Sequence, residues 1–171
     1  MKFGILGAGF IAAVMADTLC RMAQQGETGA ELYAVAARDI GRARAFAAEH
    51  NVPKAYGSYE EMLRDPAVEV VYIATPHSLH YRHIKLCADH GKHILCEKPM
   101  ATTYIDCDGM VLQAHNSHVI LLEGMRALFA PGFARLHQLI PEIGTLRRIT
   151  AGYCQYSSRY DSYLSGGRPN A

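Results

Sequence analysis

The sequence lacks the charge blocks and long apolar runs that mark specialised classes of protein. Its 17 basic and 16 acidic residues are scattered over 171 positions and give a net charge of +1. We therefore expect no nucleic-acid partner and no acidic interaction tail. The longest apolar runs reach about seven residues, far below the roughly 20 that a membrane helix requires. Met1 and Lys2 lead directly into an apolar segment, so we expect no signal peptide, no membrane partner and a cytoplasmic protein.

The five cysteines are too widely spaced for a zinc site or a redox pair. They are Cys20, Cys87, Cys96, Cys107 and Cys154. We expect them to be buried, reduced and inert. His77, His80 and His83 follow one another at intervals of three, but no cysteine or carboxylate joins them at a useful spacing, so we expect no metal.

What the sequence does contain is a regular alternation of strand-like and helix-like segments. We expect strands at residues 3–6, 32–37, 55–56, 68–74, 93–96 and 119–122. The intervening helices show apolar spacings of three and four, as in Ile11, Met15, Leu19 and Met22, and Asp39 and Ser58 are suited to capping two of them. This alternation predicts an α/β fold with a doubly wound parallel sheet, the Rossmann dinucleotide-binding fold, over residues 1–124.

The pattern changes after Glu123. Residues 131–140 predict a helix, and residues 146–156 predict a strand of a different sheet. A lone strand cannot satisfy its backbone, so we expect residues 125–171 to be the truncated start of an α+β domain for substrate binding and oligomerisation. We also expect this chain alone to bind cofactor better than it turns over substrate.

The segment from Gly7 to Ala12 has the form G-x-G-x-x-A between the first strand and its helix. That context is the one in which this pattern binds dinucleotides. Gly7 permits the tight turn, Gly9 lets pyrophosphate approach the backbone, and Ala12 lets helix and strand pack closely. The free N–H groups of the helix N-terminus would face the phosphates. The alternative is an ordinary strand–helix turn.

The end of the second strand distinguishes NADP from NAD. NAD sites place an acid there for the ribose 2′-hydroxyl, whereas NADP sites use an arginine. Here Ala37 occupies the usual acidic position and Arg38 follows, with Arg42 one helical turn further on. We therefore predict NADP as cofactor, with NAD the less favoured choice. The alternative is that Arg38 is a solvated surface residue and Asp39 only a helix cap.

Three segments resemble the glucose–fructose oxidoreductase, inositol dehydrogenase and rhizopine-catabolism (Gfo/Idh/MocA) family. They are GAGFIA at residues 7–12, ATPHSLH at 74–80 and CEKPMA at 96–101, and the Glu-Lys-Pro portion is the most specific. The resemblance extends over about residues 1–160. Within the family, AVAARD, KAYGSYEEM and LCEKPM look most like the NADP-dependent dimeric dihydrodiol dehydrogenases.

This resemblance implies roles for individual residues. Gly7, Gly9, Phe10 and Ile11 would hold the pyrophosphate, and Arg38 would meet the 2′-phosphate. Thr75, Pro76 and His80 would line the adenosine and ribose side. Glu97 and Lys98 would reach the nicotinamide ribose and the substrate, with Lys98 as the catalytic lysine and Glu97 orienting it.

The chemistry of alcohol oxidation gives Lys98 its implied role. A hydride leaves for the nicotinamide and a proton must leave the hydroxyl. A lysine partly shielded from water beside a cationic ring can accept or share that proton. The alternative is a surface Glu-Lys pair in a loop.

One departure from the dihydrodiol dehydrogenase pattern concerns the substrate. Arg126 stands where that pattern has an aromatic residue near the substrate, which implies a more polar or anionic substrate. The leading hypothesis is an NADP-dependent oxidoreductase acting on a small polyol, sugar or related alcohol or carbonyl, as a homo-oligomeric dimer or tetramer. The alternatives are a non-catalytic dinucleotide sensor of the same fold and an unrelated Rossmann reductase.

Overall fold

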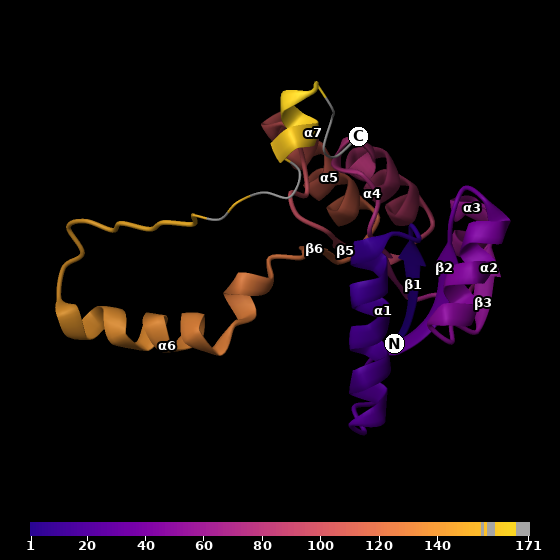
Figure 1. The fold of residues 1–171 in the computed structure, drawn as a ribbon, viewed down its shortest axis with the longest axis horizontal. Coiled ribbons are helices and arrows are strands. Elements are labelled where there is room, and N and C mark those ends of the chain that lie inside the picture. The colour runs from indigo at the N-terminus through magenta and orange to yellow at the C-terminus, as the bar shows by residue number, and fades with distance from the viewer. Residues whose placement is uncertain (155, 157–159, 167–171) are drawn as a thin grey trace. The chain divides into compact units, whose positions relative to one another are not determined.

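The computed structural model describes residues 1–154, 156 and 160–166, and Figure 1 shows the chain as a ribbon. The chain divides into two compact units, Met1–Gly124 and Met125–Ala171. The first unit contains the sheet and the predicted cofactor motif. Within the described residues, no helix combines the length and apolar character needed to span a membrane.

Six parallel strands form a single sheet in the order β3-β2-β1-β4-β5-β6. The strands are β1 Lys2–Leu6, β2 Glu31–Ala36, β3 Lys54–Tyr56, β4 Val70–Ile73, β5 His93–Cys96 and β6 Leu121–Glu123. This is the strand order of dinucleotide-binding doubly wound sheets, in which the winding reverses beside the first strand. The predicted fold of this part of the chain is confirmed.

Helices cover both faces of the sheet. They are α1 Phe10–Gln24, α2 Ile40–Glu49, α3 Tyr59–Arg64, α4 His80–Asp89 and α5 Tyr104–Asn116, with a 3-10 turn at His77–Leu79 before α4. Neighbouring strand residues point to opposite faces. Ile5 packs in one cluster with Ala12 and Ala16 of α1, whereas Leu6 packs in another with Ile84 of α4 and Met110 of α5. The strands are therefore apolar on both sides.

Side chains cap the starts of two helices, and Ser58 caps α3 as predicted. Ser58 and Thr103 each accept a hydrogen bond of 3.1 Å from the backbone N–H three residues later, at the starts of α3 and α5. Such a bond satisfies one of the N–H groups that a helix start leaves without a partner.

The predicted apolar stripe of α1 is wrong by one position at its start. The buried residues are Ala12, Ala16 and Leu19, whereas Ile11 is 37% exposed. The small side chains of Ala12 and Ala16 allow the helix to lie close to β1 and β2. A reading by apolar size alone selected the larger neighbouring side chain.

The predicted strand at 146–156 is also wrong. Residues 146–154 and 156 have no regular secondary structure, and residue 155 lies outside the described residues. The described elements of the second unit are helical: α6 Pro131–Leu139, α7 Tyr160–Leu164 and 3-10 turns at Arg126–Phe129 and Ile140–Ile143. Alternating apolar residues form a strand only beside a partner strand, because the backbone N–H and C=O groups need a ladder.

Candidate dinucleotide-binding and catalytic site

The predicted site residues, Arg126 excepted, lie in the loops that follow β1, β2, β4 and β5 or in the first turn of the helices α1 and α4. The carboxyl ends of parallel strands lie at one edge of the sheet, and ligands of such sheets bind in the crevice outside that edge. The order of the strands therefore brings four loops together that are far apart in the sequence.

The turn after β1 requires glycine at its first position. Gly7 has a φ of +103°, and its N–H donates to the carbonyl of Ala36 at 2.9 Å. A Cβ at Gly7 would lie 2.9 Å from the carbonyl oxygen of Ala74, so even alanine is excluded. At Gly9 a Cβ would meet nothing within 4 Å, which leaves its backbone open to an approaching group. Gly9 also precedes the first residue of α1 and provides no side-chain cap.

Phe10 is 84% exposed at the start of α1. The first turn of this helix carries no acidic residue that would repel a phosphate. The open Gly9 backbone, the uncapped helix start and the absence of acid fit a pyrophosphate at this turn.

The end of β2 carries no free carboxylate at the predicted ribose position. Ala37 is buried, and Arg38 is exposed. The Asp39 carboxylate accepts the backbone N–H of Arg42 at 2.8 Å and so caps α2. The Arg42 guanidinium donates to the Ala8 carbonyl at 3.4 Å, which brings a positive charge to the glycine turn. The chain after β2 thus carries two arginines, and the nearest acid is engaged as a cap.

Thr75 follows β4 and is held by two histidines of α4. Its hydroxyl lies 2.8 Å from Nδ1 of His83, and its carbonyl oxygen lies 2.9 Å from Nε2 of His80. His83 is buried against the edge of the Tyr59 ring, and burial, together with the charge of Arg82, lowers its pKa to about 4. His83 is therefore a neutral core residue.

His80 departs from its expected role. Its side chain is fully buried, and its second ring nitrogen, Nδ1, lies 3.0 Å from the carbonyl oxygen of Pro99. A ring enclosed in this way does not line the ribose. It connects the loop after β4 to the loop after β5.

Glu97 is fixed by a tyrosine of β4, within the predicted strand at 68–74. The hydroxyl of Tyr72, a buried residue of β4, donates to Glu97 Oε1 at 2.5 Å. Burial and this bond to a carboxylate raise the pKa of Tyr72, so its hydroxyl stays protonated as a donor. The Tyr72 hydroxyl on an otherwise apolar strand was the feature of the sequence that could have indicated this contact, because buried tyrosine hydroxyls usually find a hydrogen-bond partner.

Lys98 is exposed, and its backbone N–H lies 3.2 Å from Glu97 Oε2. The chain's own residues do not shield its amine from water, so the expected shielding would have to come from bound cofactor and substrate. The adjacent backbone is tied to β6: Gly124 N–H donates to the Cys96 carbonyl at 2.7 Å, and Met100 N–H donates to Glu123 Oε1 at 2.8 Å. The loop that carries Lys98 is thus anchored on both sides.

Arg126, the proposed substrate contact, belongs to the second unit, Met125–Ala171, and is exposed. Its role stays a prediction.

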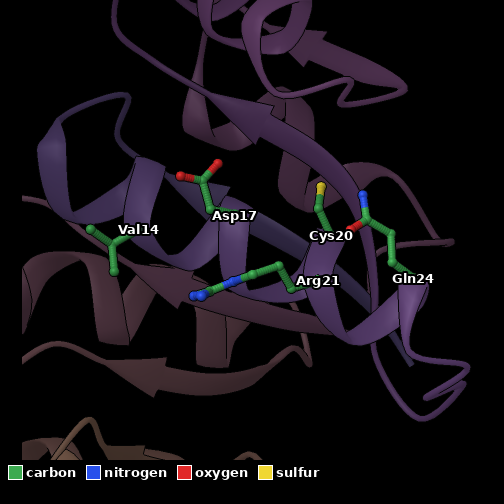
Figure 2. A pocket seen from close by; sticks show the side chains of 5 residues that line it. All are labelled: Val14, Asp17, Cys20, Arg21 and Gln24. Carbon is green, nitrogen blue, oxygen red and sulfur yellow. The ribbon is translucent and has the colours of Figure 1, made fainter.

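A surface hollow lies on α1 and away from this edge. Figure 2 shows its lining side chains along the helix: Val14, Asp17, Cys20, Arg21 and Gln24. Asp17 is already engaged with Nδ1 of His50 at 2.9 Å. Val14 lies more than one helical turn beyond Gly9 and the other four residues lie at least two turns beyond it, so we do not assign the cofactor to this hollow.

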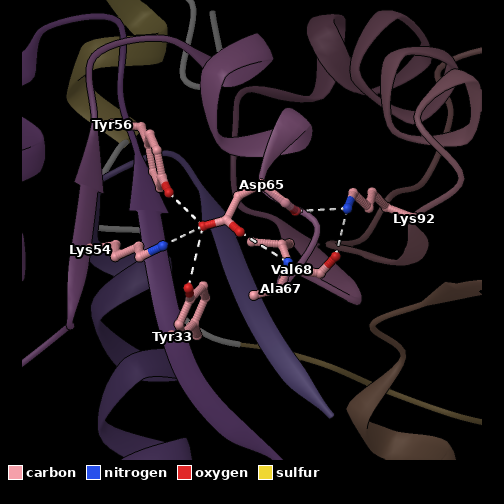
Figure 3. Close-up of polar contacts among 7 residues, drawn as sticks. All are labelled: Tyr33, Lys54, Tyr56, Asp65, Ala67, Val68 and Lys92. Carbon is pink, nitrogen blue, oxygen red and sulfur yellow. Dashed lines mark hydrogen bonds and ion pairs between the residues drawn. The ribbon is translucent and has the colours of Figure 1, made fainter.

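A second polar cluster, centred on Asp65, was also missed from the sequence. In Figure 3 the hydroxyls of Tyr33 and Tyr56 and the Lys54 ammonium converge on Asp65 Oδ2, at 3.3, 2.6 and 2.8 Å. The bonds from Lys54 and Tyr56 hold the pKa of Asp65 well below its usual value. Lys92, largely buried, donates to the carbonyls of Asp65 and Val68. This cluster joins β2 and β3 to the chain entering β4 and is structural.

Comparison with known proteins matches the part of the chain that contains the sheet and the candidate site. The family described as "Oxidoreductase family, NAD-binding Rossmann fold" matches residues 1–125. The chain is 40% identical over 171 residues to scyllo-inositol 2-dehydrogenase (NADP(+)) of Bacillus subtilis, covering all of this chain and 51% of that protein. It is 39% identical over 155 residues to trans-1,2-dihydrobenzene-1,2-diol dehydrogenase of Sus scrofa, covering 90% of this chain and 45% of that protein. The chain therefore spans about half the length of these relatives.

A solved structure has the same fold. An NAD binding oxidoreductase from Klebsiella pneumoniae superposes with a TM-score of 0.78 at 31% identity, over 83% of this chain and 39% of that one.

Proposed function

The chain belongs to the Gfo/Idh/MocA family of oxidoreductases, with its NAD-binding Rossmann fold, and we propose that it is the dinucleotide-binding part of an NADP-dependent enzyme. The enzyme transfers a hydride between the nicotinamide and a secondary alcohol or its ketone. The observation that carries the proposal is the Ala37-Arg38 end of β2 beside the open Gly9 turn, with Asp39 engaged as a cap.

The residues at the sheet edge fit the parts of NADP in chain order. Gly7, Gly9, Phe10 and Ile11 hold the pyrophosphate at the start of α1. Arg38 binds the 2′-phosphate, because a guanidinium offers several donors to phosphate oxygens. Arg42 adds a second positive charge from α2. Thr75 and Pro76 form the wall after β4, and Glu97 and Lys98 reach the nicotinamide side.

Lys98 handles the proton. When bound, the nicotinamide ring supplies the acceptor or donor of the hydride. The Lys98 amine takes the proton of the substrate hydroxyl during oxidation and returns it during reduction. Glu97, held by Tyr72, fixes the backbone from which Lys98 extends. Arg126 is proposed as a contact to a polar or anionic part of the substrate.

The substrate class is a small polyol, sugar or cyclic diol. The two relatives are named for scyllo-inositol and for a dihydrobenzene diol, and both compounds carry adjacent hydroxyl groups on a six-membered ring. We propose such a vicinal diol for this protein. We further propose that residues 125–171 begin the α+β domain for substrate binding and for a homo-oligomer, a dimer or a tetramer. All five cysteines are free, which fits the proposed cytoplasmic location.

Titration of the chain with NADPH and with NADH by calorimetry tests the cofactor assignment. We expect tighter binding of NADPH. Arg38→Asp should weaken NADPH binding at least about tenfold, because it removes a charge-assisted hydrogen bond, and should affect NADH little.

Arg44→Asp is the matched control, since Arg44 is exposed on α2 and has no assigned contact with the cofactor. Retention of the NADPH preference by Arg38→Asp would overturn the role of Arg38. Equal binding of the two cofactors by the unmodified chain would overturn the NADP assignment but not the fold.

A further inference from the structure

His80 joins two turns of the proposed site through one buried ring. Nε2 lies 2.9 Å from the carbonyl oxygen of Thr75, and Nδ1 lies 3.0 Å from the carbonyl oxygen of Pro99. Thr75 follows β4 and Pro99 follows β5. The imidazole, at 0% exposure, therefore spans the gap between the two loops.

The two partners of this ring restrict its protonation state. A carbonyl oxygen only accepts hydrogen bonds. A neutral imidazole has one N–H and one bare nitrogen, whereas an imidazolium has two N–H groups. A neutral His80 would turn a nitrogen lone pair toward one of the two oxygens, at 2.9 or 3.0 Å, and that contact would be repulsive instead of a hydrogen bond. Only the cation satisfies both contacts.

The surroundings of His80 are compatible with a positive charge on its ring. His83, one turn further along α4, is neutral because burial, with the charges of Arg82 and His80 itself, lowers its pKa to about 4. His77, in the 3-10 turn that precedes α4, lies with its ring centre 5.4 Å from that of His80 and inclined to it. The turns after β4 and β5 present backbone carbonyls to the ring.

We propose that His80 is a buried imidazolium that donates to both carbonyls and holds the Thr75 turn and the Lys98–Pro99 turn at a fixed separation. It is then a positioning residue for Lys98, which directly precedes Pro99, and not a contact of the dinucleotide. The positioning of Lys98 by His80 rests on the proposed function, whereas the positive charge of the His80 ring does not.

The ring can be observed directly by nitrogen-15 NMR of the labelled 171-residue chain near neutral pH, without cofactor. We expect His80, assigned through its own backbone amide, to show two protonated ring nitrogens. A ring with one bare nitrogen would overturn the proposal. Failure of the chain to bind NADPH would remove the proposed function and leave this result unaffected.

A pair of variants tests the coupling between the two turns. His80→Gln removes the link to Pro99, whereas His83→Gln alters the contacts with the Thr75 hydroxyl and the Tyr59 ring but leaves the link to Pro99 in place. We measure hydrogen exchange at the Met100 amide, which is bonded to Glu123. His80→Gln should speed this exchange about tenfold or more, and His83→Gln should change it by less than about twofold. Equal effects of the two variants, or none from His80→Gln, would show that His80 does not position this loop.

Discussion

Among single residues, Lys98 is the one on which the proposed chemistry depends. It is exposed, and the loop around it is fixed through Glu97 and Met100. In a protein that also contains the proposed substrate domain, Lys98→Met should leave the NADPH affinity within a few-fold and lower turnover of a vicinal diol by about a hundredfold or more, as expected for loss of a proton-transfer group. Oxidation of scyllo-inositol, followed by NADPH absorbance, provides the assay.

Lys85→Met is the control for this substitution, because Lys85 is an exposed lysine of α4. Unchanged turnover in Lys98→Met would remove Lys98 from the mechanism. An unmodified protein that binds NADPH tightly but converts no member of a panel of polyols and ketones would favour the dinucleotide sensor.

His83 gives the fold a dependence on pH in a defined window. Its pKa is about 4 in the folded chain, against an ordinary value of 6.5. Below pH 6.5 the unfolded chain binds a proton at this ring and the folded chain does not, so the free energy of unfolding falls until about pH 4. In His83→Gln the free energy of unfolding should decrease less over this pH range, and the difference from the unmodified protein should be about 3 kcal/mol at most. Urea unfolding at several pH values measures it.

His115→Gln is the matched control, because His115 is exposed near the end of α5. The same dependence of unfolding free energy on pH in the unmodified protein and in His83→Gln would contradict the lowered pKa of His83.

Asp65 contributes to stability over a different, lower pH range. Its lowered pKa gives stability that is present above the usual carboxylate pKa of 3.8 and is lost only as the pH falls below that value.

Local chemistry could be predicted from the sequence residue by residue, but contacts between distant residues could not. Asp39 and Ser58 cap helices as expected, because a cap depends on neighbours three residues away. Tyr72 reaches Glu97 across 25 positions, and Tyr33 reaches Asp65 across 32. Such pairs are set by the order of strands in the sheet, and no local pattern encodes them.

Among the helices, α1 is the one whose packing controls the cofactor turn. Ala12 and Ala16 are fully buried against the sheet, within three turns of Gly9. Ala12→Leu should lower the free energy of unfolding by about 1–3 kcal/mol through overpacking and should weaken NADPH binding, because the helix start must move. Chemical denaturation and calorimetry measure the two effects.

Val14→Leu serves as the control on the same helix, since Val14 is 38% exposed. A stability loss in Ala12→Leu equal to that of Val14→Leu would show that α1 does not need small residues against the sheet.

Helices were easier to predict than strands at the scale of elements. A helix satisfies its own backbone, so a local cap such as Ser58 at the start of α3 was a sufficient signal for it. A strand depends on a neighbour. The residues of β4 pair with β1 and β5, whereas residues 146–154 have no partner strand and form no strand.

For the whole molecule, the alternation of strands and helices was sufficient to predict a parallel doubly wound sheet. Crossovers between parallel strands are nearly always right-handed, which leaves few possible topologies. The edge that carries the glycine turn, Arg38 and Lys98 follows from that topology. The separation of the chain into two units after Gly124 coincides with the change in sequence pattern.

The position of β1 in the sheet affects how the chain folds while it is being translated. β1 is made first, yet it lies between β2 and β4. Its second neighbour, β4, ends at Ile73. At roughly 5–20 residues per second, translation needs several seconds to reach that strand. During this time one edge of the nascent β1 has no partner strand, so the emerging chain presents the unpaired edge of an apolar strand to chaperones before the sheet can close.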